Sequence, residues 1–149
     1  MKKEIHLNWF YPYPTETIWK YLTDPELLRQ WSSIHKTTPF EAREGFEWTE
    51  QQKPRRGWDG IMYLKVLEVV PNQKLSYSLK GGPKPGELSL DTIVTYELTS
   101  VDGGTELHLS HTGFEGFKGA FTAFIMEKGW MKIFNKRFRK FINEQIVNV

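Results

Sequence analysis

The sequence predicts an α+β fold in which a curved antiparallel sheet packs against a long C-terminal helix, with two short helices near the N-terminus. Two observations lead to this prediction. Between about residues 37 and 112, short alternating apolar segments are separated by turn residues, which is typical of antiparallel strands. From residue 130 to residue 145, large apolar residues recur at helical spacing, so this segment is expected to bury one face against the sheet.

The chain begins with a strand signal and then a helix signal. Residues 5–11 are rich in aromatic and β-branched side chains, and Pro12 ends the run. Ile18, Trp19 and Leu22 then share one face of a helix. This face is expected to pack on the core.

A second short helix is predicted from residue 24. Asp24-Pro25-Glu26 combines a capping carboxylate, a proline at the first helical position and an acid in the first turn. We expect this helix to direct Leu27, Leu28 and Trp31 inward.

The middle of the chain is predicted to form strands joined by turns. Phe40, Phe46 and Trp48 are expected in short strand-like pieces, and residues 55–60 in a turn. Longer strands are expected over residues 61–70, 75–79, 93–99 and 105–112. Gly-Pro-rich residues 81–86 predict a flexible loop, and Asp102-Gly103-Gly104 a hairpin turn.

The last third is predicted to be one amphipathic helix. Its apolar stripe comprises Trp130, Phe134, Phe138 and Phe141, continued by Gln145, with Ile133 and Ile142 beside it. Lys128, Lys132, Lys136 and Lys140 recur on the other side, where a solvated face is the favoured interpretation over a patch for an acidic partner. If the two short helices hold sheet and helix apart at one end, an internal cavity remains between them.

Composition excludes several classes of function. The chain of 149 residues predicts a single domain, residues 1–149, and its formal net charge of +2 requires no nucleic-acid or membrane partner. Without cysteine there is no disulfide framework and no thiol nucleophile. No apolar run reaches the length of a membrane span, and no signal-peptide core follows Met1, so a cytoplasmic location is expected.

Several segments, in order and spread over nearly the whole chain, resemble bacterial-type members of the activator of heat-shock-protein-90 ATPase homologue-like family. These segments are residues 19–28 with Trp31, residues 66–77, 94–98 and 103–114, and Gly129-Trp130. The resemblance implies the START-like (SRPBCC) helix-grip fold of birch-pollen-allergen and steroidogenic-acute-regulatory lipid-transfer domains. It also implies small-molecule binding between sheet and helix.

A set of large aromatic side chains is predicted to face inward and to line the ligand site. The set comprises Trp31, Phe40, Trp48, Tyr63, Tyr77, Tyr96, Phe114, Trp130 and Phe134. For any single member, close packing in the core is slightly favoured over ligand contact. As a set they favour a cavity with an apolar body and a few hydrogen-bonding groups.

His111 completes the candidate site. It shares a strand face with Leu107 and Leu109, whereas His108 falls on the opposite, solvent-facing side. His111 is therefore expected near the cavity mouth, where a structural hydrogen bond is favoured over direct ligand contact.

Lys65 shares its strand parity with Tyr63, Leu67 and Val69. We expect a bulge that resets the register there, because an unpaired ammonium in the core is costly.

Other chemistry has little support in the sequence. The four histidines show no converging metal-ligand set, and His6 and His35 have no partner pattern. No serine occupies a nucleophile elbow, and no glycine spacing matches a dinucleotide fingerprint. Glu44, Glu47 and Glu50 are interpreted as solvated hairpin residues. No cofactor and no metal are expected.

Three functions remain open. The favoured one is non-enzymatic binding of a hydrophobic or aromatic molecule of lipid, polyketide or phenolic type, in a stress- or antibiotic-related role. The second, by fold-level analogy alone, is a cyclase- or hydrolase-type enzyme acting on such a ligand. The third is a chaperone-interacting module, for which the lysine stripe is the only candidate surface.

Overall fold

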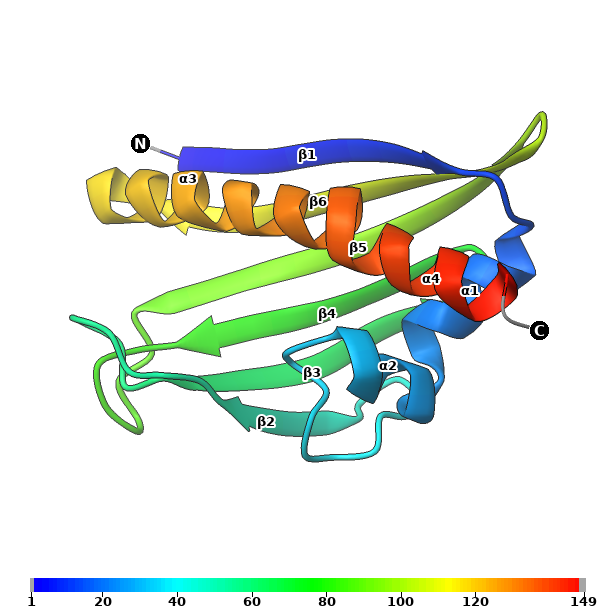
Figure 1. Ribbon diagram of the computed structural model, residues 1–149. Coiled ribbons are helices and arrows are strands. Elements are labelled where there is room, and N and C mark those ends of the chain that lie inside the picture. The colour runs from blue at the N-terminus through cyan, green and yellow to red at the C-terminus, as the bar shows by residue number, and fades with distance from the viewer. Residues whose placement is uncertain (1, 148–149) are drawn as a thin grey trace.

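The computed structural model describes residues 2–147, in which six antiparallel strands form one curved sheet with a long helix across its face (Figure 1). The strands are β1 (Lys2–Tyr11), β2 (Glu47–Gln51), β3 (Ile61–Val70), β4 (Lys74–Gly81), β5 (Leu90–Val101) and β6 (Gly104–Glu115). Their order in the sheet is β1-β6-β5-β4-β3-β2, so the first and last strands of the chain pair at one edge. The predicted α+β architecture, a curved antiparallel sheet with a C-terminal helix, is confirmed.

The two short helices are α1 (Thr15–Thr23) and α2 (Pro25–Trp31), which lie together at one end of the sheet (Figure 1). The Asp24 carboxylate caps α2 by accepting the backbone N–H groups of Glu26, at 2.9 Å, and Leu27, at 3.1 Å. This confirms the predicted helix start. Leu28 and Trp31 are buried, whereas Leu27 is half-buried.

The C-terminal helix is continuous but contains one wide turn. It runs through α3 (Gly116–Lys132), the π-helical segment η1 (Ile133–Arg137) and α4 (Phe138–Val147). Residues buried at a strict four-residue interval would drift about 40° per step around a regular α-helix. In the wide turn the Phe138 N–H donates to the Ile133 carbonyl five residues back, which reduces that drift.

This turn decides which residues of the helix face the sheet. The buried stripe is Trp130, Phe134, Phe138 and Ile142. The expectation that Phe141 continues the stripe is wrong, since Phe141 is half-buried and Ile142 takes the inner position. The Phe134 carbonyl accepts the Tyr11 hydroxyl at 2.7 Å, so the wide turn is also tied to β1.

The register of β3 both confirms and corrects the prediction. A bulge lies between Val66 and Glu68, as expected from the position of Lys65. Leu64 and Val66 are buried, which places Tyr63 and the exposed Lys65 on the opposite face. The prediction that Tyr63 faces inward is therefore wrong. The bulge follows residues 62–66, so it does not change the face on which Tyr63 lies.

Residues 37–46 were expected to contain short strands, but the structure shows a loop there. Phe40 is nevertheless buried, and its ring packs edge-on against Trp48 at 5.1 Å between centroids. The end of the loop also hydrogen-bonds to β3, since the Gly45 N–H donates to the Val66 carbonyl at 2.9 Å and the Val66 N–H donates to the Phe46 carbonyl at 2.8 Å.

Candidate functional site

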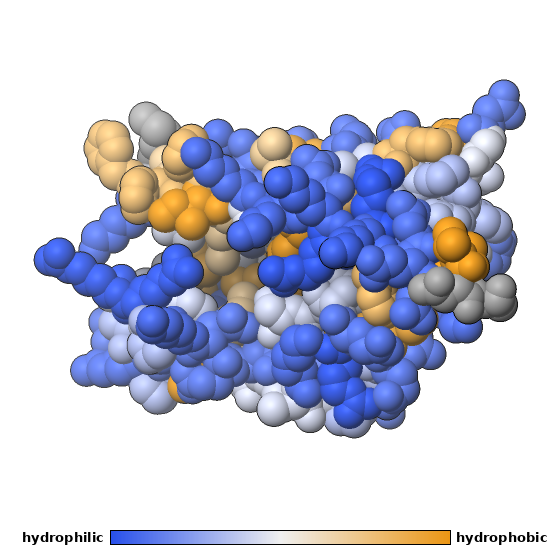
Figure 2. Space-filling model, in the orientation of Figure 1, coloured by the Kyte–Doolittle hydropathy of each residue, from blue (hydrophilic) through white to orange (hydrophobic). Residues whose placement is uncertain are grey.

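A cavity of about 540 Å³ lies between the sheet and α3, towards the end of the sheet that carries the β2–β3 and β4–β5 loops. Its volume falls within the range of about 300–1,000 Å³ typical of small-molecule sites. Figure 2 shows the hollow on this face, with apolar surface inside and hydrophilic side chains around it.

Apolar side chains from the sheet and from the helix form most of the cavity wall. The sheet contributes Met62, Leu79 and Leu90, and the helix contributes Ile125, Met126 and Ile133. Met side chains are flexible and polarizable, so they adapt to ligands of different shape.

Three tryptophans of the wall show the cavity only their ring carbons. The indole N–H of Trp31 donates to the Tyr21 carbonyl at 2.9 Å, and that of Trp58 to the Ile61 carbonyl at 3.0 Å. The N–H of Trp130 donates to His111 Nδ1 at 3.0 Å. Because each donor already has a protein acceptor, these rings offer apolar contact and no hydrogen bond to an occupant.

Tyr96 supplies a hydroxyl within the apolar wall. Its Oη lies 2.9 Å from the Tyr77 hydroxyl, and both rings are buried. Tyr77 does not line the cavity, and a buried hydroxyl needs a hydrogen-bond acceptor. We therefore assign the Tyr77 hydroxyl as the donor and Tyr96 Oη as its acceptor. The Tyr96 proton is then free to donate to an occupant. Burial raises the pKa of both phenols, which keeps them protonated at neutral pH.

His111 is fully buried and braces the cavity wall from behind. Because the Trp130 N–H is a donor only, His111 Nδ1 must accept, and the ring proton resides on Nε2. Nε2 then donates to Thr92 Oγ1 at 2.8 Å, and that hydroxyl donates to the Leu79 carbonyl at 2.8 Å. Burial lowers the pKa of His111 to about 3, so the ring is neutral.

The structure divides the predicted site residues into three groups. Trp31, Tyr96 and Trp130 line the cavity. The members that are buried but do not line it are Phe40, Trp48, Tyr77, His111, Phe114 and Phe134. Tyr63 lies on the other face of the sheet, as described above.

Several cavity residues were missed by sequence reasoning. Arg55, Arg56 and Trp58 fall in a segment that was predicted only to form a turn. Met62 was missed because neighbouring residues of a strand point to opposite faces, and Tyr63 was predicted to face inward. The apolar residues Met62, Leu64 and Val66 occur at every second position, and this alternation was the signal that could have placed Met62 on the inner face.

Gly129 lies in the interior of α3 and lines the cavity. A Cβ added there would meet no atom within 4 Å. Glycine in a helix interior is destabilising relative to alanine by about 0.5–1 kcal/mol. Gly129 is exposed, so at this point of the lining the helix places no side chain between the cavity and solvent.

Two further expectations about ionisable groups are corrected. Glu50 is buried, not solvated, and its carboxylate accepts the backbone N–H groups of Lys36 and Thr37 and the Thr37 hydroxyl. His35, expected to have no partner, lies with its Nδ1 2.6 Å from the Ser32 hydroxyl. Burial lowers the pKa of His35 to about 3.

His108 lies on the outer face of the sheet as predicted, whereas His6 has a partner that was not predicted. The His6 ring stacks on His108 with 5.5 Å between centroids. Across residues 2–147 no group of three or more His, Cys, Asp or Glu side chains is arranged to hold a metal ion.

The sequence of residues 12–143 matches the family described as activator of Hsp90 ATPase homolog 1-like protein. The chain belongs to this family. No curated protein shows significant sequence similarity to it.

Solved structures share the fold. Protein MLL2253 from Mesorhizobium loti superposes with a TM-score of 0.79 at 24% identity, covering 95% of this chain and 98% of that one. CalU16 from Micromonospora echinospora gives 0.70 at 22% identity, covering 99% and 80%. DynU16, a protein in the dynemicin biosynthetic locus, gives 0.69 at 19% identity, covering 94% of this chain and 47% of that one.

The membership and the neighbours agree with the predicted helix-grip architecture. The family is generally built on a small-molecule-binding fold. Within residues 2–147 no helix combines the length and apolarity needed to cross a membrane.

Proposed function

We propose that this family member binds a small, largely apolar, ring-containing molecule in the cavity between the sheet and α3. The observation that carries the proposal is the cavity itself, about 540 Å³ in volume and walled by apolar side chains and tryptophan faces. Close packing is the norm in protein interiors, so a space of this size calls for an occupant. Lipids, polyketides and phenolic compounds have suitable chemistry.

The polar groups of the wall narrow the choice of occupant. Among the buried aromatic residues of the wall, Tyr96 presents a hydroxyl donor and the three indole N–H groups are already paired, while Ser32, Ser33, Gln52 and Thr122 add polar side chains elsewhere in the lining. A ligand with an apolar body and one accepting oxygen, such as a carbonyl or phenol, matches this arrangement.

The catalytic alternative gains no observation in its favour. The cavity-lining side chains of the described chain include no carboxylate and no imidazole. His111, the one candidate base of the sequence, has both ring nitrogens engaged by Trp130 and Thr92. We therefore propose binding without chemistry, in which the fold holds and shields the ligand.

Filling the cavity tests the proposal. The probe is N-phenyl-1-naphthylamine, a neutral aromatic amine that fluoresces strongly in apolar surroundings. The parent protein should bind it saturably with one site. Gly129→Phe adds a ring at this exposed point of the cavity lining and, where the ring covers the apolar wall, should weaken binding at least about tenfold, the ratio that about 1.4 kcal/mol gives.

Gly129→Ala is the matched control, because its methyl group meets no atom within 4 Å and leaves most of the cavity open. It should bind the probe with the parent's affinity. Circular dichroism and the unfolding temperature establish that both variants are folded. Absence of saturable probe binding by the folded parent protein would refute the proposal, and equal affinity in Gly129→Phe would place the probe away from the α3 side of the cavity.

A further inference from the structure

The charges around the cavity are of one sign. Arg55, Arg56 and Lys80 line it, and no acidic side chain of the described chain does so. Lys80 has a carboxylate nearby, since its Nζ lies 3.9 Å from Asp91. Within residues 2–147 neither Arg55 nor Arg56 has a carboxylate within 4.0 Å.

An ordered turn holds the two arginines at the mouth. The backbone N–H of Arg55 donates to the Trp58 carbonyl, and the N–H of Trp58 donates to the Arg55 carbonyl, both at 2.9 Å. Gly57 takes a positive φ of 81° that closes this turn. The Trp58 ring lines the cavity and its N–H is tied to Ile61, so the turn is anchored to the wall itself.

The position of the charges fits an amphipathic occupant. Both arginine side chains are exposed, whereas Tyr96 and Trp130 in the wall are buried. A carboxylate placed beside the arginines would keep part of its hydration and avoid the large cost of burying a charge. The guanidinium group binds carboxylates through two parallel N–H donors, which favours this head group over a neutral one.

We propose that the cavity selects amphipathic anions, with the apolar ring-containing body inside and a carboxylate or similar anionic head held by Arg55 and Arg56. This inference rests on the proposed function and adds the chemical class of the ligand. A cationic head group meets repulsion at the same place, so the selection works in both directions.

Three probes that share one body test the inference. They are 2-naphthylacetic acid, 2-(2-naphthyl)ethanol and 2-(2-naphthyl)ethylamine, which are anionic, neutral and cationic at neutral pH. Each displaces N-phenyl-1-naphthylamine in a competition titration. At low salt the acid should bind about three- to tenfold tighter than the alcohol, as expected for partly exposed ion pairs, and the amine should bind most weakly.

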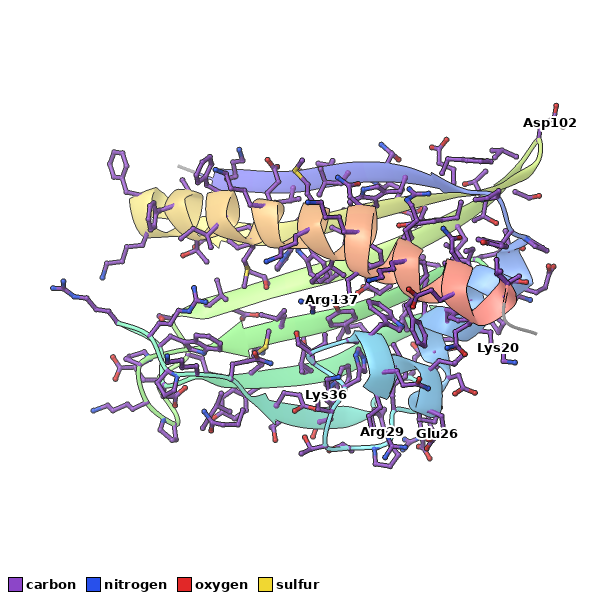
Figure 3. All side chains as sticks on the ribbon, viewed as in Figure 1. Lys20, Glu26, Arg29, Lys36, Asp102 and Arg137 are labelled. Carbon is purple, nitrogen blue, oxygen red and sulfur yellow. The ribbon has the colours of Figure 1, made fainter. Side chains whose placement is uncertain are left out.

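The charge dependence is then traced to the two arginines. Arg55→Gln with Arg56→Gln should bring the acid's affinity to that of the alcohol and leave the alcohol's affinity within about twofold. The control, Lys20→Gln with Arg29→Gln, removes the same charge from exposed residues of α1 and α2, at the other end of the molecule in Figure 3. It should keep the acid's advantage. At about 1 M salt, where the Debye length is about 3 Å, the advantage should shrink in the parent.

The outcomes separate the inference from the function on which it rests. If N-phenyl-1-naphthylamine does not bind in the cavity, the proposed ligand-binding function itself fails. If it binds there and none of the three probes displaces it, the cavity function stands and the anion selection is overturned. If the alcohol binds as tightly as the acid, the cavity function stands and the anion selection is overturned. If Lys20→Gln with Arg29→Gln reduces the acid's advantage over the alcohol as much as Arg55→Gln with Arg56→Gln does, the effect comes from overall charge. That result would also overturn the role of Arg55 and Arg56.

Discussion

The C-terminal helix meets the sheet in two different ways along its length. Around Phe134 and Phe138, aromatic rings from several elements close the space completely. Trp31 packs edge-on against both rings, with centroids 5.9 and 4.9 Å away, and both phenylalanines are fully buried. Less than two turns earlier, beside Gly129, the same helix leaves a cavity of about 540 Å³.

The two ends differ in the size of the side chains that lie between the helix and the sheet. At the closed end, large rings fill the gap between helix and sheet. At the open end, the helix places glycine and flexible methionine over the sheet, and Phe121 lines the cavity yet stays 65% exposed. In this arrangement the size of the cavity is set by residue size at a few helix positions.

The largest expected effect breaks the closed end. Phe134→Ala removes a fully buried ring that contacts the rings of Trp9, Tyr96 and Trp130. We expect the free energy of unfolding to fall by about 3–5 kcal/mol, the cost of a large cavity in a packed core. Urea denaturation of purified protein measures it.

The comparison variant is Phe117→Ala at the start of α3. Its side chain is 84% exposed, so the loss should stay within about 0.5 kcal/mol. Similar losses for Phe117→Ala and Phe134→Ala would contradict the contrast between the two ends of the helix.

The next effect is acid sensitivity. Burial lowers the pKa values of His35 and His111 from the ordinary 6.5 to about 3 in the folded protein. The unfolded chain therefore binds these protons first, and stability is lost as the pH falls below about 6.5 towards 3. At pH 5 each histidine should lower the free energy of unfolding by about 2 kcal/mol relative to pH 7.5.

A variant isolates the histidine behind the cavity wall. His111→Gln carries no titrating group, so its loss of stability between pH 7.5 and pH 5 should be smaller than the parent's by about 2 kcal/mol. Urea denaturation at both pH values gives the two differences. An unchanged pH dependence in His111→Gln would mean that this ring titrates normally, and hence that it does not stay neutral in hydrogen bonds to Trp130 and Thr92.

Local sequence signals predicted much of the fold. The Asp24 cap, the glycine hairpin at residues 102–104 and strand β3 each depend on chemistry within a few residues, and all are present. The helical stripe was predicted as far as Phe138. Beyond that point the wide turn shifted it, and the hydrogen bond that this turn makes with Tyr11 joins residues 123 positions apart, which leaves no local signal in the sequence.

The site was harder to predict because its walls come from distant segments. Trp31, Tyr96 and Trp130 were identified from burial patterns, but burial alone could not separate them from Phe134, which is packed and away from the cavity. Arg55 belongs to a loop that borders the cavity only because α3 lies across the sheet. Which inward residues line a space depends on how the facing side chains fill it, and this is a property of the packed structure.

The smallest expected effect tests the open end through glycine itself. Gly129→Ala should raise the free energy of unfolding by about 0.5–1 kcal/mol, because alanine favours the helix and its Cβ meets no atom within 4 Å. Gly119→Ala in the same helix is the matched comparison, since its Cβ would come within 3.0 Å of the Phe114 carbonyl carbon. Gly119 lies in the first turn of α3 and Gly129 in its interior, so both the crowding at Gly119 and its smaller propensity gain favour Gly129→Ala. We expect Gly129→Ala to be the more stable of the two in urea denaturation. A stabilisation by Gly119→Ala equal to that of Gly129→Ala would show that the space beside Gly129 is nothing unusual along α3, and the contrast between the two ends of the helix would lose its basis.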